Sequence, residues 1–225
     1  MNDRPNNRRA LERRLLLAGL AGAVALPAAR AQSDRQGPAT PAQTLGPFYP
    51  RNPSERPLDT DADLLRVEGD RVLTRGVPLY LTGRVVDRRG TVVPDATVEI
   101  WQCDANAVYH HPDGGAETAR DPHFQGYGVA STDAGGTFHF RTIRPVAYPG
   151  RTPHIHVRVQ AAGGRVLATQ FYLPDERGNR NDFLFRRLNA DEQSALTLRF
   201  GPPTPSAHAL ARATRQTARA EVVLA

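Results

Sequence analysis

Apolar and polar residues alternate in many short stretches between residue 78 and the C-terminus, and turn-forming residues separate these stretches. The run His-Ile-His-Val-Arg-Val-Gln at 154–160 shows the pattern most clearly, because every second residue is aliphatic. Successive side chains of a strand point to opposite faces, so this alternation predicts strands with one buried face. Strands are predicted at residues 79–87, 96–102, 137–141, 154–160, 166–173, 195–200 and 221–224, and short helices at 181–188 and 205–218.

Many short strands with Gly and Pro between them indicate an all-β fold, a β-sandwich of mostly antiparallel strands with one or two short helices. This domain is assigned to residues 78–225. The preceding residues 32–77 are rich in Pro, Gly, Asp and Arg and show little periodicity, which predicts an extended N-terminal arm. Within the arm, residues 44–50 are too apolar for a free linker, and we expect them to pack on the domain or on a neighbouring subunit.

The first residues of the chain have the features of an export signal. Arg13-Arg14 precedes an uncharged apolar run at 15–26, and Ala29-Arg30-Ala31 follows as a cleavage site. The paired arginines predict a twin-arginine signal peptide at residues 1–31, with the mature protein periplasmic or secreted. The apolar run is shorter than the ~20 residues that span a bilayer, so no membrane attachment is expected after cleavage.

The charge of the chain argues against nucleic acid as a partner, although the formal net charge is +6. Residues 1–31 hold six Arg (4, 8, 9, 13, 14 and 30) against Asp3 and Glu12, a net of +4, which leaves 6 − 4 = +2 for the rest. The chain has no Lys, and its Arg residues are scattered among acids rather than gathered in a stripe. Cys103 is the only cysteine, so an intrachain disulfide and a thiolate metal cluster are both excluded.

Two histidines of the predicted strand 154–160 are candidates for binding a metal. His154 and His156 are two residues apart, so they share one face of the strand while aliphatic residues anchor the other. An edge strand with solvent-exposed histidines would show the same pattern. Two tyrosines, Tyr109 and Tyr148, precede the strand, and no Asp or Glu lies near it. Phenolate oxygen with imidazole nitrogen suits a ferric ion better than zinc or copper(I).

The segments at 99–109, 138–145 and 148–156 resemble the intradiol ring-cleavage dioxygenases, the family of protocatechuate 3,4-dioxygenase and the catechol and hydroxyquinol 1,2-dioxygenases. The resemblance implies a β-sandwich catalytic domain that holds non-haem Fe(III). It is closest to a small exported branch of the family, because the connection from Tyr148 to His154 is short and a helical dimerisation region is absent. The implied site comprises the iron ligands Tyr109, Tyr148, His154 and His156, the catalytic residues Tyr148, Arg151 and Gln170, and the substrate-binding residues Gly46, Pro47 and Arg151.

The implied substrates are a small aromatic diol of the catechol type and O2. The ring would open between its two hydroxylated carbons to a cis,cis-muconate-type dicarboxylate, with both oxygen atoms of O2 inserted. Because the arm and the ligands share one chain, a homo-oligomer is expected. Two alternatives stay open from the residues alone, a non-enzymatic transthyretin-like binding module and a copper or zinc site. The remaining histidines lie outside the ligand positions of the family pattern: His110, His111, His123, His139 and His208.

Overall fold

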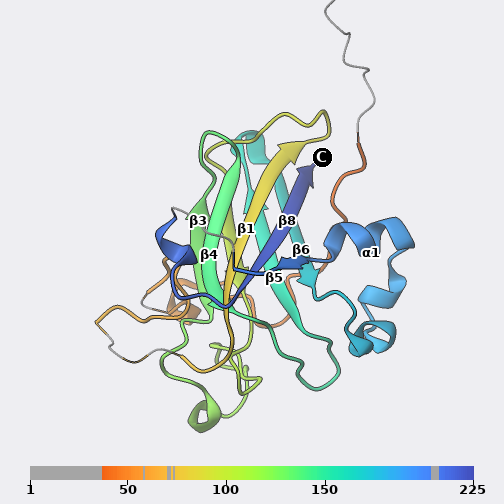
Figure 1. The fold of residues 1–225 in the computed structure, drawn as a ribbon. Coiled ribbons are helices and arrows are strands. Elements are labelled where there is room, and N and C mark those ends of the chain that lie inside the picture. Colours follow the sequence, from red (N-terminus) through yellow and green to blue (C-terminus); the bar gives the residue numbers. More distant parts are fainter. Residues whose placement is uncertain (1–36, 58, 70–71, 73, 204–207) are drawn as a thin grey trace, which may run out of the picture. The chain divides into compact units, whose positions relative to one another are not determined.

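The computed structural model describes residues 37–225 apart from 58, 70–71, 73 and 204–207 (Figure 1). The predicted signal peptide, residues 1–31, lies outside the described residues. The regular elements are β1 (Pro78–Asp87), β2 (Thr97–Trp101), β3 (Tyr127–Ser131), β4 (Thr137–Ile143), β5 (His154–Gln160), β6 (Val166–Tyr172), α1 (Ala190–Leu196), β7 (Arg199–Gly201) and β8 (Gln216–Leu224).

The strands form two four-stranded sheets, with the orders β4-β1-β8-β7 and β3-β2-β5-β6. Every pair of neighbouring strands is antiparallel except β1 and β8, which are parallel. In Figure 1 the β4-β1-β8-β7 sheet lies in front of the other. The two sheets share one hydrophobic core, to which β1 contributes Leu79 and Leu81 and β5 contributes Ile155 and Val157. A β-sandwich of mostly antiparallel strands is therefore confirmed.

The alternation on β5 places its histidines on the side of the sheet that faces away from the core. Ile155, Val157 and Val159 are completely buried in the core, so His154 and His156 point to the opposite face. The antiparallel register aligns His156 with Trp101 of β2 and with Gln170 of β6. The outer face of the β3-β2-β5-β6 sheet thus carries a row of large polar and aromatic side chains.

The described part of the arm lies against the sandwich and is held there by hydrogen bonds. The amide of Thr40 donates to Val223 of β8 (2.9 Å), and the amide of Gln43 donates to Ala168 of β6 (2.8 Å). Further along, Tyr49 donates to the carboxylate of Glu99 on β2 (2.7 Å). Residues 37–49, orange in Figure 1, therefore pass from the β8 edge onto the outer face of the β3-β2-β5-β6 sheet.

Of two elements predicted near the C-terminus, a helix is wrong and a strand is only partly right. The helix predicted at 205–218 is absent from its described residues, which hold only a 3-10 turn at Ala209–Ala211 before β8 begins at Gln216. Alanines formed half of the inner face of β8, and their small size hid the strand pattern. Of the strand predicted at 195–200, residues 199–200 lie in β7, whereas 195–196 belong to α1, whose start is fixed by a capping box between Asn189 and Glu192.

Other predictions near the sheet edges were incomplete. The helix predicted at 181–188 corresponds to 3-10 turns at Arg177–Asn181 and Phe185–Arg187. Strand β3 was not predicted, because it is short and its Gly128 interrupts the alternation. Gly128 is required there, since a side chain would collide with Leu64 and with the backbone of Asp61.

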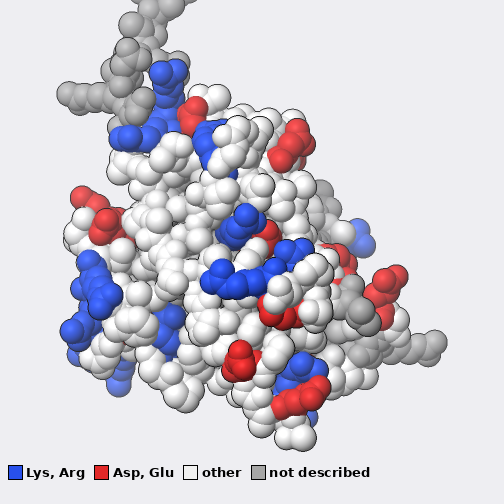
Figure 2. Space-filling model, turned by 180° about the vertical axis from the view of Figure 1, so that it is seen from behind, with Lys and Arg blue, Asp and Glu red and all other residues white. Residues whose placement is uncertain are grey.

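Acidic and basic side chains are mixed on the surface of the domain (Figure 2). Figure 2 shows acidic side chains beside basic ones at the centre and bottom of the face that it presents. No helix in the described ranges combines the length and apolar character that crossing a bilayer requires.

Candidate metal centre

The two histidines of β5 bring their outer ring nitrogens together. The Nε2 atoms of His154 and His156 are 3.2 Å apart, and both side chains are buried. Two nitrogens bound to one ion at about 2.1 Å are roughly 3.0 Å apart when they subtend a right angle. The observed separation therefore suits two ligands of a single metal ion.

The neighbouring backbone fixes the tautomer of His154. Its Nδ1 is 2.7 Å from the carbonyl oxygen of Thr152, which can only accept, so Nδ1 carries the proton and donates it. The Nε2 lone pair is then free to bind a metal, as in many protein metal sites. Burial, and next the charge of Arg151, lower the pKa of His154 to about 4. The ring is therefore neutral at neutral pH, as a metal ligand must be.

His156 is held between the sheet and the arm. Its ring stacks on Trp101 of β2 with ring centroids 4.8 Å apart and planes 6° apart. On the arm, Gly46 adopts φ +75°, and a Cβ there would lie 3.2 Å from Cε1 of His156. Burial, with the neighbouring charges of His154 and Arg151, lowers the pKa of His156 well below its ordinary value. A glycine is favoured at position 46 for two reasons: the backbone is left-handed there, and the His156 ring leaves little room for a side chain.

A tight turn carries Tyr148 to the histidines. Pro149 and Gly150 occupy its central positions, Gly150 has φ +85°, and the amide of Arg151 donates to the carbonyl of Tyr148 (2.9 Å). The Tyr148 ring lies 5.6 Å from that of His154 between centroids. Burial raises the pKa of Tyr148, although Arg151 opposes the shift.

A loop ordered by Asp104 carries Tyr109. The Asp104 carboxylate accepts from the amides of Asn106 and Val108, and the amide of Tyr109 donates to Gly114 (3.2 Å). A side chain at Gly114 would collide with the Tyr109 backbone, its Cβ lying 2.3 Å from the carbonyl oxygen. The Tyr109 and Tyr148 rings meet edge to face at 5.5 Å between centroids. Two residues far apart in sequence are thereby placed beside one another.

The hydroxyl of Tyr109 is buried and has no hydrogen-bond partner among the described residues. Burial, and next the proximity of Tyr148, raise the pKa of Tyr109 well above its ordinary value. A buried phenol without a partner costs about 1–3 kcal/mol. Binding a cation as phenolate would remove that cost, so the Tyr109 oxygen fits a metal ligand.

Arg151 and Gln170 lie beside the four candidate ligands. The Nη1 of Arg151 is 3.4 Å from Nε2 of His154 and 3.5 Å from the hydroxyl of Tyr148. Its Nη2 donates to Oε1 of Gln170 (2.6 Å), and Gln170 is completely buried. On its other side, Nε donates to the carboxylate of Asp182 (2.8 Å), a residue that was not predicted.

The arm closes the site from the opposite side. Phe48 stacks on Tyr109 with centroids 4.4 Å apart and meets the Tyr148 ring edge-on at 6.2 Å. Pro47, its neighbour, is exposed. Gly46 therefore contacts His156 directly. Pro47 lies between two residues that contact the site, Gly46 and Phe48.

A cavity of about 300 Å³ borders Tyr109, and His110 and His111 also line it. These two histidines therefore lie near the site without joining the His154–His156 pair. Among the described residues, no three His, Cys, Asp or Glu side chains converge as metal ligands. A site with four protein ligands here consequently requires both tyrosines, a donor set suited to ferric iron.

Sequence comparison relates the chain to dioxygenases. A family model described as "Dioxygenase" matches residues 45–197. The protocatechuate 3,4-dioxygenase beta chain of Burkholderia cepacia is 33% identical over 186 residues, covering 79% of this chain and 74% of that protein. The hydroxyquinol 1,2-dioxygenase of a Rhizobium species is 28% identical over 165 residues, and the match spans 65% of this chain but only 52% of that relative.

Solved structures agree. The dioxygenase domain of a dioxygenase–carbohydrate-binding fusion from Streptomyces sp. SirexAA-E is 32% identical, with a TM-score of 0.60, and covers 83% of this chain and 98% of that one. Hydroxyquinol 1,2-dioxygenase from Pseudomonas putida has a TM-score of 0.62, covering 84% of this chain and 67% of that one. At 23% identity, this second likeness supports the fold alone.

Proposed function

Because this chain belongs to the intradiol ring-cleavage dioxygenase family and is a dioxygenase, we propose that it opens catechol-type diols with a non-haem ferric ion. The ligands would be Tyr109, Tyr148, His154 and His156. One observation carries the proposal: the Nε2 atoms of His154 and His156 converge to 3.2 Å, with both tyrosine rings and Arg151 packed around them. A non-enzymatic binding module of transthyretin type is not favoured, because the relatives are enzymes.

A ferric ion at this position would act as a Lewis acid, lowering the pKa of the catechol hydroxyls and drawing electron density from the ring. The reaction would join one catechol and one O2 into a cis,cis-muconate-type dicarboxylate, and both oxygen atoms would enter the product. The bond between the two hydroxylated carbons would break.

The two tyrosines would have different tasks. Tyr109 is buried at 3% exposure on a loop fixed by Asp104, which suits a ligand that stays in place. Tyr148 is only partly buried and stands at the end of a turn, so its ring can leave the site at lower cost. We assign to its phenolate oxygen the proton that the substrate hydroxyl gives up.

Arg151 would stabilise negative charge on the bound ring. Its guanidinium faces the candidate ligands, and burial of the side chain strengthens its electrostatic interaction with any anion there. Gln170 would hold the guanidinium through its Oε1. The arm, through Gly46, Pro47 and Phe48, would border the substrate and exclude water from the ligands.

The activity test uses the mature protein loaded with iron and incubated in air with catechol, hydroxyquinol or protocatechuate. The proposal predicts a ring-opened dicarboxylate that carries two labelled atoms when the gas is ¹⁸O2. A product opened beside the hydroxyl pair, or one with a single labelled atom, would contradict it.

Export and assembly are further parts of the proposal. Residues 1–31 would direct the folded protein through the twin-arginine pathway, so Arg13→Lys with Arg14→Lys should leave it in the cytoplasm. Normal export of that double variant would contradict this route. We also expect a homo-oligomer, and a monomeric mass by light scattering at micromolar concentration would contradict that expectation.

A further inference from the structure

Asp182 is a fully buried carboxylate beside Arg151, near the candidate metal centre. Its side chain has 0% exposure, and it accepts hydrogen bonds at both oxygens. Oδ2 accepts from Nε of Arg151 (2.8 Å) and from the amide of Thr152 (3.0 Å). Oδ1 accepts from the amides of Leu184 (3.0 Å) and Phe185 (2.9 Å). The carboxylate therefore joins the segment after β6 to the turn that carries the site.

These contacts restrain Arg151 along its whole guanidinium group. Asp182 holds Nε, Gln170 holds Nη2, and Nη1 is left facing His154 and Tyr148. The ring of Phe183 lies 5.3 Å from the guanidinium carbon, which covers one side of the plane. Because Nε and Nη2 are both hydrogen-bonded, the planar guanidinium is held in one orientation. In that orientation Nη1 points towards His154 and Tyr148.

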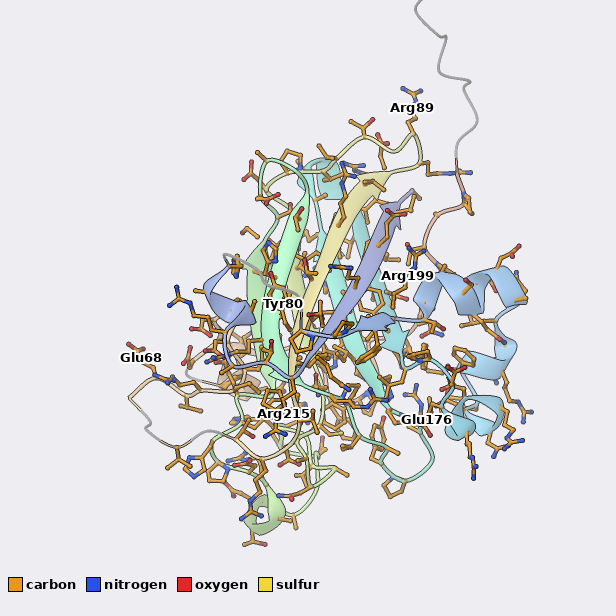
Figure 3. The ribbon with its side chains drawn as sticks, in the orientation of Figure 1. Glu68, Tyr80, Arg89, Glu176, Arg199 and Arg215 are labelled. Atoms are coloured by element: carbon orange, nitrogen blue, oxygen red, sulfur yellow. The ribbon has the colours of Figure 1, made fainter. Side chains whose placement is uncertain are left out.

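The same carboxylate also reaches the histidine pair. Thr152, whose amide donates to Asp182, uses its carbonyl oxygen to accept from Nδ1 of His154. In addition, the Thr152 hydroxyl donates to Oδ1 of Asn179 in the 3-10 turn that precedes Asp182 (2.9 Å). Glu176, labelled in Figure 3, marks the start of this segment, which contacts Thr152 through Asn179 and Asp182.

We propose that Asp182 is a positioning residue of the dioxygenase reaction, which acts by holding Arg151 in the orientation that faces the reacting ring. The proposal rests on the proposed function of the site. Orientation of a charged group is worth a large factor in rate, because a misplacement of about 1 Å can cost roughly 100-fold. Asp182 itself touches neither the candidate ligands nor the place where substrate would bind.

The chain offers a matched control on the other sheet. Asp63 forms an ion pair with Arg141 of β4 through two guanidinium nitrogens, whereas Asp182 contacts Arg151 through Nε alone. Like Asp182→Asn, Asp63→Asn weakens an Asp–Arg ion pair without changing the side-chain volume. A general loss of stability would appear in both variants, whereas a loss of positioning would appear only in the second.

The test compares the full mature protein with Asp182→Asn and Asp63→Asn. Asp182→Asn removes the negative charge opposite Arg151 and one of two acceptor oxygens, and its NH2 faces N–H donors in either orientation of the amide. The guanidinium is therefore held less firmly while the side-chain volume is kept. We expect kcat for catechol to fall about 100-fold with KM and iron content little changed, and wild-type values for Asp63→Asn. In the metal-free protein, hydrogen exchange at Nε of Arg151, followed by NMR, should become faster only in Asp182→Asn.

A double-mutant cycle separates positioning from folding. If Asp182 acts through Arg151, then Asp182→Asn should cost little further activity in an Arg151→Gln background. Equal losses in both backgrounds would overturn the proposal, as would wild-type kcat or unchanged Arg151 exchange in Asp182→Asn. An iron-loaded wild type that opens no catechol would overturn the proposed function and this role with it. An active wild type with a fully active Asp182→Asn overturns the positioning role alone.

Discussion

The outer faces of the two sheets each carry a cluster of tyrosine and histidine, and the two clusters are built differently. On β1 and β4, Tyr80 and His139 lie beside His208, and Figure 3 labels Tyr80 there. The Tyr80 hydroxyl is 2.6 Å from Nδ1 of His139, and the two histidine rings stack at 4.1 Å between centroids. Nδ1 of His208 accepts from the amide of Leu210.

In the cluster on β5, by contrast, ring nitrogens of two histidines converge on one point that Arg151 and two tyrosines also face. The Nε2 atoms of His154 and His156 face each other, and the Tyr109 hydroxyl has no partner in the described part of the chain. The same residue types therefore form a stacked, hydrogen-bonded cluster on one sheet and a candidate metal centre on the other. What distinguishes a site is the convergence of potential ligand atoms at one point, with a buried hydroxyl left without a partner, not the presence of Tyr and His.

Removal of one histidine from each cluster should give the largest difference between the two clusters in iron content and activity. His154→Ala deletes one of the two converging nitrogens, so we expect iron binding to be lost. The fall in turnover should exceed the roughly 10²–10³-fold that loss of one stabilising hydrogen-bond donor costs. His139→Ala in the other cluster should keep full iron content and activity. Metal analysis and steady-state rates check both variants, and equal iron loss in the two would contradict the distinction.

Removal of one phenol oxygen should have the next largest effect. Tyr148→Phe keeps three candidate ligands and the ring packing, so we expect iron to stay bound while turnover falls by roughly 10²–10³-fold. The matched variant Tyr80→Phe loses its hydrogen bond to His139, which costs about 1 kcal/mol of stability but no activity. Undiminished turnover in Tyr148→Phe would reject the role of this residue as ligand and base.

The arm that covers the candidate site is held in place by Glu99 of β2. Glu99 accepts from Tyr49 of the arm and from Tyr127, and its other oxygen pairs with Arg158 (2.5 Å). Glu99→Ala leaves the partly buried Arg158 charge without this partner, so we expect a loss of about 3 kcal/mol in the free energy of unfolding. Denaturant titration measures this loss. A change within about 0.5 kcal/mol would show that the arm is held by other contacts.

The smallest expected effect is on how stability depends on pH, through His139 of the Tyr80–His139–His208 cluster. Burial, and next the charge of His208, lower the pKa of His139 in the folded protein. The unfolded state then binds the proton more readily, so this histidine favours folding above its ordinary pKa, near 6.5. That contribution declines as the pH falls below 6.5 towards the folded pKa. His139→Gln should therefore flatten the dependence of the midpoint of unfolding on pH, and an unchanged slope would contradict it.

The sequence was sufficient to predict the part of the site that depends on strand alternation. His154 and His156 share the outer face of β5 because aliphatic residues alternate with them, and this needs no tertiary information. The positions of Tyr109 and Tyr148 came from the family resemblance. The structure brings both beside the histidines, while their roles as ligands stay predictions.

Asp182 shows what the sequence could not provide. It lies between two 3-10 turns, where an Asp ordinarily accepts from nearby amides, and it does so here with Leu184 and Phe185. Its second oxygen reaches Arg151, 31 residues earlier in the chain. Only the folded arrangement of the 148–152 turn against this segment reveals that contact. Strand β8 was predicted only over residues 221–224 for a different reason, since the inward-facing alanines of its first half are also common in helices.

The most direct test of the account is the visible absorption spectrum of the purified mature protein, with metal analysis, before and after anaerobic addition of catechol. The account predicts bound iron and a broad visible band from tyrosinate-to-iron charge transfer, which shifts when catechol displaces Tyr148. A colourless protein that contains no iron and cannot be reconstituted with it would contradict the central claim that Tyr109, Tyr148, His154 and His156 form a ferric site.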